Sequence, residues 1–282
     1  PESTVEPDTP ETSGTTEEPE EVIPEPESAA EEPVPEVFYD LGTLLSSGED
    51  GPEFATFSEY LDGTPDPDPD FIISWPLASK YILALDHYSS GSIHGGMDID
   101  AEWGAEIRAV ADGTVILVSN ECPHTDNLGD TCSIGNGWTS GYGNCVIVQH
   151  EVNGKTYTSI YGHMKQDTIE VSQGDTVTEG QLLGRVGSSG NSSGRHLHLE
   201  VHPGTYWGWG ENRSKAVRGQ TLRYFLNNPI ALTGMSFASH IVKTSAYFSD
   251  WILENCKYSG GVYVYSGPSA TATPAPTPAA TP

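Results

Sequence analysis

The sequence predicts a mostly β protein, with a small antiparallel β-sheet or sandwich core flanked by disordered linkers. Three observations support this fold class. Short runs of β-branched and aromatic residues recur in the middle of the chain, and turn residues separate them at close spacing. No segment of that region shows the capped, 3.6-residue apolar repeat of an amphipathic helix. Both ends of the 282-residue chain have the composition of linkers.

The front of the chain is predicted to be an acidic arm. Of the 40 acidic and 12 basic residues, which give a net charge of −28, residues 1–70 hold 22 acids and no base. Residues 1–36 combine this charge with many prolines, so they have too little apolar surface to offset the entropy lost on folding. Residues 37–70 are ambiguous, because they could form short helices before a TPDPDPD linker. We interpret the arm as a solvated spacer, with an inhibitory pro-segment as the alternative.

Residues 71–232 are predicted to form the folded domain, and about 160 residues suffice for a proper core. Strands are expected at GTVILVS, GNCVIVQHEV, KTYTSIYGHM and HLHLEVH, with turns at DGT, NGK, QGDTV and EGQLLG. Residues 233–265 are expected to add a small annex, a helix or a hairpin. Residues 266–282 form a second linker of Pro, Thr and Ala. The composition therefore indicates one module of a longer surface protein.

The charge pattern excludes two classes of partner. Beyond the acidic arm, the other 18 acids and the 12 bases leave a net charge of only −6. A nucleic-acid-binding protein needs a basic stripe to neutralise phosphates, and an anionic membrane surface needs one as well. No apolar run of about 18 residues occurs, so no membrane span is expected. The chain begins at Pro1 without a signal peptide, so we expect the native start to lie upstream. We expect a monomer.

The four cysteines predict two disulfides in an oxidising compartment. They show no CxxC spacing, which argues against a cysteine zinc site, and four cysteines allow three pairings. Cys122 and Cys132 bracket a short polar loop and are predicted to pair, which leaves Cys145 with Cys256. Four unpaired buried thiols are the alternative. With the two linkers, the predicted disulfides favour an extracellular or cell-surface location.

Four of the nine histidines lie in contexts that suggest metal chemistry. His94 precedes Asp98 by four residues, His196 precedes His198 by two, and His163 lies in YGHM. Residues two or four apart on a strand share one face. Two imidazoles and a carboxylate with an open fourth position are the pattern of catalytic zinc. Taken singly each motif is weak, and the remaining histidines are interpreted as core or surface residues: His87, His124, His150, His240, and His202, which we place past the end of its strand.

The order of these motifs carries a family resemblance. The matching segments are SWPL at 74–77, HGGMDID at 94–100, AVADGTVILVS at 109–119, YGNCVIVQH at 142–150, YGHM at 161–164 and GDTVTEGQLLGRVGSSGNSSGRHLHLEV at 174–201. Over about 71–232 the chain resembles the lysostaphin/LytM-type zinc metalloendopeptidases, which are peptidoglycan hydrolases. The resemblance implies a β-sheet core with a substrate groove and one Zn²⁺ per chain, held by His94, Asp98 and His198. It implies that His163 and His196 are the catalytic histidines.

Two departures from the family pattern are visible. Arg195 stands where the family usually has Pro, and the loop bearing Cys122 and Cys132 is an insertion that puts the substrate preference in doubt. No HExxH glutamate is present, so an imidazole, with an ordinary pKa of about 6.5, is the natural proton carrier. The sequence does not divide the roles between the two catalytic histidines.

The resemblance implies an endopeptidase that cuts stem-peptide or cross-bridge bonds of bacterial peptidoglycan, with peptidoglycan peptides as its partners. The alternative on the same fold is a non-catalytic wall-binding or regulatory module, whose signature would be a lost metal ligand. None is lost here. A third hypothesis, set without the resemblance, is an unrelated zinc hydrolase or hydratase. Tyr142, Tyr206, Trp207 and Trp209 are candidate groove walls or, equally, packing residues.

Overall fold

The computed structural model describes residues 70–85, 88, 94–123, 141–206, 220–244 and 246–267. Several predictions fall wholly or mostly outside these residues. They concern the spacer at 1–36, the ambiguous segment 37–70, the linker 266–282, and the single residues His87, His124, Cys132, Trp207 and Trp209.

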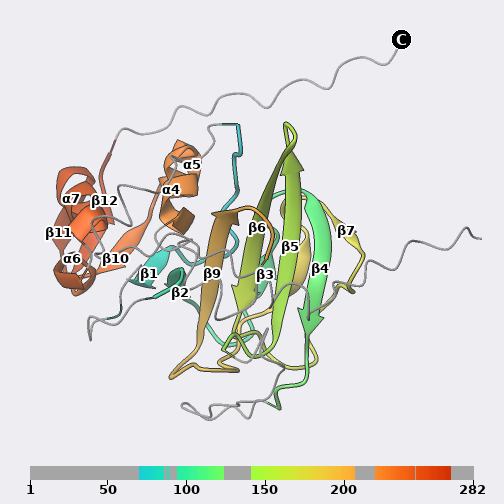
Figure 1. The fold of residues 1–282 in the computed structure, drawn as a ribbon. Helices are drawn as coiled ribbons and strands as arrows, with labels where there is room; N and C mark the ends of the chain where they lie inside the picture. Colours follow the sequence, from blue (N-terminus) through green and yellow to red (C-terminus); the bar gives the residue numbers. More distant parts are fainter. Residues whose placement is uncertain are drawn as a thin grey trace, which may run out of the picture. The chain divides into compact units, whose positions relative to one another are not determined.

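A ten-stranded sheet runs through the described residues (Figure 1). Its strands are β1 (Tyr81–Ala84), β2 (Met97–Asp100), β4 (Gly113–Ser119), β5 (Cys145–Val152), β6 (Lys155–Gly162), β7 (Thr176–Val177), β9 (His196–Pro203), β10 (Ser236–Ala238), β11 (Cys256–Ser259) and β12 (Val262–Tyr265). They lie in the order β11-β12-β10-β1-β2-β9-β6-β5-β4-β7. All neighbours are antiparallel except β1 and β10. Two short strands, β3 (Glu106–Arg108) and β8 (Leu182–Arg185), form a separate antiparallel sheet. The predicted mostly β fold is confirmed.

Within the described residues, four short helices follow the last long strand. They are α4 (Gln220–Leu226), α5 (Pro229–Leu232), α6 (Ile241–Thr244) and α7 (Ala246–Asn255). Helix α4 packs against β9, where the backbone N–H of Val201 donates to Thr221 Oγ1 at 3.0 Å. Helix α5 begins with a proline, which is tolerated in the first turn of a helix because that position needs no N–H partner. None of the helices in the described residues is long and apolar enough to cross a membrane.

The segment predicted as a helix or a hairpin, residues 233–265, contains both. Helix α7 leads into a hairpin of β11 and β12, and the hairpin joins the ten-stranded sheet through β10 (Figure 1). Because β10 pairs in parallel with β1, this segment extends the same sheet that carries the central strands. The division of the chain into domains stays a prediction.

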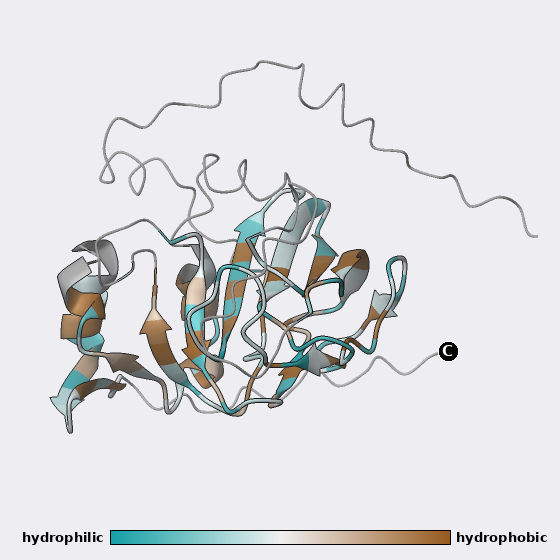
Figure 2. Cartoon of the chain, turned by 90° about the horizontal axis from the view of Figure 1, so that it is seen from below, coloured by the Kyte–Doolittle hydropathy of each residue, from teal (hydrophilic) through white to brown (hydrophobic). Residues whose placement is uncertain are grey.

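Apolar and polar residues alternate along β9, so one face of the strand packs in the apolar core and the other face is polar. Leu197, Leu199 and Val201 are fully buried in the main apolar core, as expected for every second residue of a strand. The opposite face of β9 carries the four polar residues of the strand: His196, His198, Glu200 and His202. Figure 2 shows the same change between hydrophobic and hydrophilic residues along the strands.

Two of the histidines interpreted as structural are indeed buried core residues. Strand β9 extends to Pro203, so His202 lies within the strand, and its predicted place past the strand end is wrong. Its Nδ1 lies 3.2 Å from the carbonyl oxygen of Pro203, and burial lowers its pKa. His150 is fully buried, with its two ring nitrogens 2.7 Å from the carbonyl oxygen of Asp112 and 2.8 Å from Ser159 Oγ.

One of the two predicted disulfides is wrong. Cys145 and Cys256 are both free, buried thiols. They begin β5 and β11, which are seven strand spacings apart in the sheet, and at about 4.8 Å a spacing the separation is on the order of 30 Å. A disulfide requires Cα atoms within about 7 Å. Burial raises the pKa of Cys145 to about 12 and that of Cys256 to about 11, so both are poor nucleophiles. Cys122 is disulfide-bonded, and its pairing with Cys132 stays a prediction.

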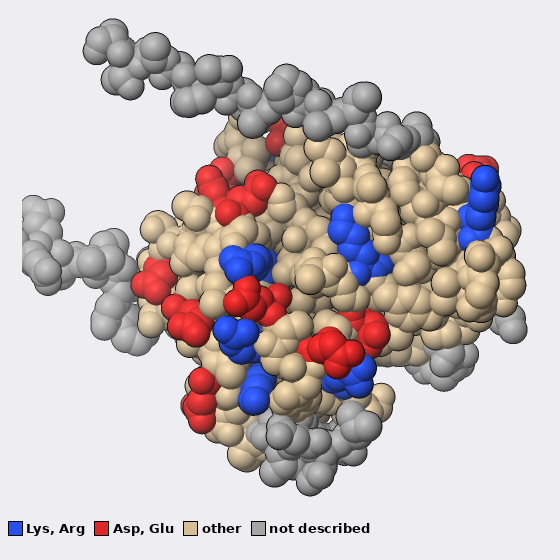
Figure 3. Space-filling model, turned by 180° about the vertical axis from the view of Figure 1, so that it is seen from behind, with Lys and Arg blue, Asp and Glu red and all other residues tan. Residues whose placement is uncertain are grey.

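The charged side chains on the face drawn in Figure 3 are interspersed, with basic groups beside acidic ones. Ion pairs in the described residues follow the same pattern, with Arg108 and Arg185 both paired to Glu106, and Arg195 to Glu102. Exposed pairs of this kind contribute about 0–1 kcal/mol each to stability, so they matter more for the surface potential than for the fold.

Candidate metal centre

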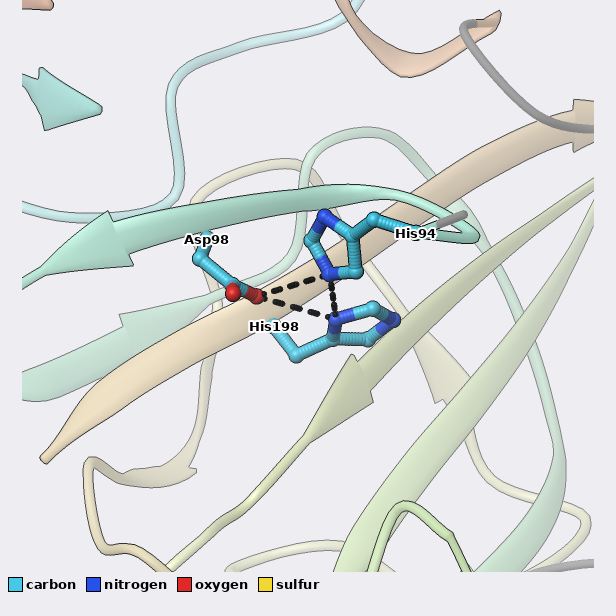
Figure 4. A group of neighbouring side chains, drawn as sticks. All are labelled: His94, Asp98 and His198. Carbon is cyan, nitrogen blue, oxygen red and sulfur yellow. Dashed lines mark hydrogen bonds and ion pairs between the residues drawn. The ribbon is translucent and has the colours of Figure 1, made fainter. Parts of the chain in front are cut away.

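Three side chains meet on the polar face of the sheet, at the pairing of β2 with β9 (Figure 4). His94 lies just before β2, Asp98 lies in β2, and His198 stands directly opposite Asp98 in the register of the two strands. Asp98 Oδ1 is 3.0 Å from His94 Nε2 and 3.0 Å from His198 Nδ1, and the two nitrogens are 2.8 Å apart. All three residues are buried, with at most 6% of their surface exposed.

The hydrogen bonds around this cluster decide which nitrogens are available. Carbonyl and carboxylate oxygens accept hydrogen bonds, so a ring nitrogen of a neutral histidine that contacts one carries the proton. His94 Nδ1 contacts the carbonyl oxygen of Leu85, and His198 Nε2 lies 3.0 Å from Glu200 Oε1. The facing nitrogens, His94 Nε2 and His198 Nδ1, are therefore both lone pairs in the neutral imidazoles. Two lone pairs and a carboxylate oxygen at this distance repel one another unless a metal cation or a proton lies between them.

The cluster fits a zinc ion. Zinc takes imidazole nitrogen and carboxylate oxygen at about 2.0–2.2 Å, which places the ligand atoms of a tetrahedral site roughly 3.3 Å apart. The observed separations of 2.8–3.0 Å are slightly shorter, so a small opening of the side chains would admit the ion. His94, Asp98 and His198 would hold it, as the sequence resemblance implies, and the fourth position would stay open.

The charges of the metal-free cluster are tightly coupled. Burial alone raises the pKa of Asp98, but the imidazoles of His94 and His196 outweigh it and hold the pKa well below its usual range. Burial lowers the pKa of His198, but the hydrogen bonds and charges of Asp98 and Glu200 outweigh burial and raise it to about 9. Without a metal, the ring of His198 therefore carries a proton on both nitrogens at neutral pH.

The two histidines predicted to be catalytic lie beside these three candidate ligands. The ring of His163 is centred 4.7 Å from that of His196 and 5.5 Å from that of His198. His163 Nδ1 donates to the carbonyl oxygen of Ser189 at 2.7 Å, and His196 Nδ1 donates to that of Gly194 at 2.8 Å. Each ring therefore keeps its Nε2 for other contacts, and His196 Nε2 lies 3.4 Å from Asp98 Oδ1.

The environments of these two histidines push their pKa values apart. Burial, followed by the neighbouring imidazoles, holds the pKa of His163 well below its usual range. Burial also lowers the pKa of His196, but the charge of Asp98 outweighs burial and raises it. Paired titratable groups with opposite shifts are typical of an acid and a base that act together. All five residues predicted from the sequence lie in this one cluster.

Two interlocked turns hold His163 in place. His163 follows β6 with a positive φ of 60°, and its backbone N–H donates to the carbonyl oxygen of Tyr142 at 2.7 Å. Gly143 and Gly190 both have positive φ, and a Cβ on either would lie 2.4 Å from the backbone nitrogen of the other. The loop that supplies Ser189 to the His163 ring therefore packs directly on the turn that binds its backbone. Only glycine fits these two positions without a shift of the backbone.

The sequence analysis missed two residues of the cluster, Glu200 and Tyr88, and left a third, Tyr142, between two interpretations. Glu200 accepts from His198, and its place on the same face of β9 as the HLH histidines was the signal for it. Tyr142, a candidate groove wall, is fully buried, and its hydroxyl donates to Glu200 Oε1 at 2.9 Å, so the packing interpretation is the correct one. The ring of Tyr88 is centred 4.4 Å from that of His94, and no pattern in the sequence indicated this contact.

Comparisons with known proteins place a family match over the segment that contains this site. Residues 92–207 match the model of Peptidase family M23. The chain is 31% identical over 128 residues to the murein hydrolase activator EnvC of Escherichia coli K12, which covers 45% of this chain and 25% of that protein. It is 33% identical over 109 residues to the DD-carboxypeptidase/endopeptidase Mpg of Neisseria meningitidis serogroup B, over 39% of this chain and 20% of that protein.

Among solved structures, the chain is similar to the catalytic domain of the antimicrobial peptidase lysostaphin from Staphylococcus simulans, at 23% identity and a TM-score of 0.31. That match covers 48% of this chain and 83% of the lysostaphin domain. The matched part of this chain spans a quarter or less of the two curated relatives. Residues 92–207 are therefore similar to peptidase family M23, and His94, Asp98, His163, His196 and His198 all lie within the matched segment.

Proposed function

We propose that this chain is a zinc-dependent endopeptidase that hydrolyses peptide bonds in the stem peptides or cross-bridges of bacterial peptidoglycan. The observation that carries the proposal is the buried cluster of His94, Asp98 and His198, whose ligand atoms lie within 3.0 Å of one another. When bound, zinc supplies a Lewis acid that polarises the scissile carbonyl and acidifies a water molecule. The substrate class is supported by the names of the relatives, a murein hydrolase activator and a carboxypeptidase/endopeptidase.

The two flanking histidines take different roles in this proposal. His163 is the general base, because its lowered pKa keeps it neutral at pH 7 and its Nδ1–H is committed to Ser189, which leaves Nε2 to accept a proton. His196 is the proton donor and electrostatic partner, because its raised pKa favours the protonated ring beside Asp98. General acid–base catalysis by one such group typically contributes about 10²–10⁴-fold to the rate.

The remaining parts of the proposal follow from the substrate. A protein that acts on peptidoglycan works outside the cytoplasmic membrane, so we place this chain at the cell surface or outside the cell, as a monomer whose partners are peptidoglycan peptides. The substrate groove is proposed to lie over the polar face of β9, where the metal ligands and both catalytic histidines are found.

A second candidate is a non-catalytic activator on the same fold, and the name of the relative EnvC favours it. A protein that only binds a partner has no need for three metal ligands and two imidazoles with opposite pKa shifts. The presence of that complete set is the reason why we prefer the peptidase.

The test measures metal content and hydrolysis in the same samples of the full chain. Peptidoglycan is digested, the released muropeptides are identified by mass spectrometry, and bound zinc is quantified by elemental analysis. We expect His94→Ala to lose both zinc and activity, and His163→Ala to keep zinc while the rate falls at least about 100-fold. His240→Ala, away from the cluster, is the control and should keep both. A wild-type chain that binds zinc but releases no muropeptide from any wall type would favour the activator.

A further inference from the structure

We infer that Glu200 is a positioning residue of the metal centre: it fixes the imidazole of His198 as a ligand and supplies the second negative charge that balances the ion. The inference rests on the zinc site of the proposed function and concerns a residue outside its ligands and its two catalytic histidines. Four observations support it, concerning hydrogen bonds, burial, charge and packing.

The hydrogen bonds of Glu200 point to His198. One carboxylate oxygen, Oε1, accepts from His198 Nε2 at 3.0 Å and from the hydroxyl of Tyr142 at 2.9 Å. The bond to Nε2 leaves Nδ1 as the free nitrogen of His198, and Nδ1 is the atom that faces Asp98 and His94. A ring flip of His198 would break this bond and turn the wrong nitrogen towards the site. Ligand histidines commonly donate their second N–H to a carboxylate in this way.

The burial of Glu200 makes its charge costly unless a cation balances it. Only 1% of the residue is exposed, and within the described part of the chain its second oxygen, Oε2, has no hydrogen-bond partner. Its ion-pair partner there is His198, and none of the lysines and arginines in the described residues forms an ion pair with it. A buried carboxylate without a cation is strongly destabilising.

The charge of the whole cluster explains how this cost is met. Asp98 and Glu200 contribute two negative charges, and a divalent ion on the imidazoles of His94 and His198 contributes two positive ones. The ion, its three ligands and Glu200 together are therefore formally neutral, and a protonated His196 adds its charge outside this group. Without Glu200 the same centre would carry one uncompensated positive charge in a buried site. The carboxylate therefore favours binding of a divalent ion, and it does so through His198 without touching the ion.

The packing around Glu200 shows that the fold leaves room for this side chain. A Cβ built on Gly96 would lie 2.7 Å from Glu200 Cγ and 2.4 Å from the carbonyl oxygen of Leu199. The second glycine of the HGGMD motif therefore admits both the close approach of β2 to β9 and the side chain of Glu200. The same motif carries the ligands His94 and Asp98, so one short segment supplies two ligands and the space for the group that orients the third.

The experiment compares zinc affinity in variants of the full chain by competition with a chromophoric chelator. Glu200→Gln keeps the size and an acceptor oxygen but removes the charge, and Glu200→Ala removes both. Loss of such a partner typically weakens metal binding or activity 10–100-fold. We expect the pH-independent Kd for zinc, corrected for the proton that the ion displaces from His198, to rise about tenfold in Glu200→Gln and closer to 100-fold in Glu200→Ala. Glu151→Gln, an exposed residue on β5, is the control for the charge change and should leave the Kd unchanged.

Two further readouts separate positioning from a purely structural role. The absorption spectrum of the cobalt-substituted chain reports ligand geometry and should change in Glu200→Gln but not in Glu151→Gln. Tyr142→Phe, which removes the second donor to Oε1, should weaken zinc binding less than Glu200→Gln does. If Glu200 only filled the core, Glu200→Gln would bind zinc within twofold of the wild type with an unchanged cobalt spectrum, and the inference would be wrong. A wild type that binds zinc without hydrolysing peptidoglycan would overturn the proposed function alone.

Discussion

Zinc binding to this site should release a proton and depend steeply on pH, because His198 must give up the proton that its carboxylate neighbours stabilise. In the metal-free chain the pKa of His198 is about 9, raised by Asp98 and Glu200 against the opposing effect of burial. Zinc needs the neutral ring. Affinity is therefore fully present above about pH 9 and is lost as the pH falls. Well below the pKa, the loss approaches tenfold in Kd per pH unit, or about 1.4 kcal/mol.

The pKa of about 9 gives a definite magnitude. At pH 7 roughly 99% of His198 is protonated, and lowering the pH from 8.5 to 7 should raise the apparent Kd roughly twentyfold. A histidine with the ordinary pKa of about 6.5 would be mostly neutral over that range and would give little change. The assay is chelator competition at four pH values, corrected for the chelator's own protonation, with calorimetry in two buffers to count released protons. A change in Kd below twofold would refute the coupling of His198 to its two carboxylate neighbours.

Three further outcomes are expected. Gly143→Ala should lower the free energy of unfolding by at least about 2 kcal/mol in urea titrations, because positive φ costs roughly 1–2 kcal/mol and the new Cβ meets Gly190. Gly154→Ala, with a similar φ but open space, is its control, and an equal loss in both would mean that the interlock contributes nothing. Cys256→Ala should cost about 1 kcal/mol, since removing a native disulfide would typically cost 2–5 kcal/mol. Peptide mapping without reductant that found Cys145 joined to Cys256 would contradict the free thiols. Glu200→Gln should make the pH dependence of zinc binding shallower above pH 7, because one of the two carboxylates that raise the pKa of His198 is removed. An unchanged pH profile in this variant would argue against an effect of Glu200 on the pKa of His198.

The features that could be predicted from the sequence are those set by neighbouring residues. The alternation in HLHLEVH is local, so the pattern alone placed Leu197 and Leu199 on one face and the two histidines on the other. The spacing of His94 and Asp98 is local as well, although β2 begins only at Met97 and His94 precedes it. These predictions needed no knowledge of which strands pair.

The features that could not be predicted from residue patterns depend on strand order. His163 reaches the cluster because Gly162, the residue before it, lies opposite His198 in the pairing of β6 with β9, and only the family resemblance indicated this. The pairing of Cys145 with Cys256 failed for the same reason, since elimination along the sequence ignores the strands that lie between β5 and β11. Helix α4 is seven residues long and is stabilised by its contact with β9, so its own sequence carried too weak a signal.

The pairing of β2 with β9 is a short seam in the middle of a wide sheet. It joins five strands on one side to five on the other through only four residue pairs, between 97–100 and 196–199. Asp98 and His198 form one of those pairs, so an ion held by both would act as a crosslink between the two halves of the sheet. At free zinc 100 times the Kd, such an ion adds about 2.7 kcal/mol to the free energy of unfolding. Removing it with a chelator should lower Tm and speed amide hydrogen exchange first at Ile99 and Leu197, the next pair along the seam.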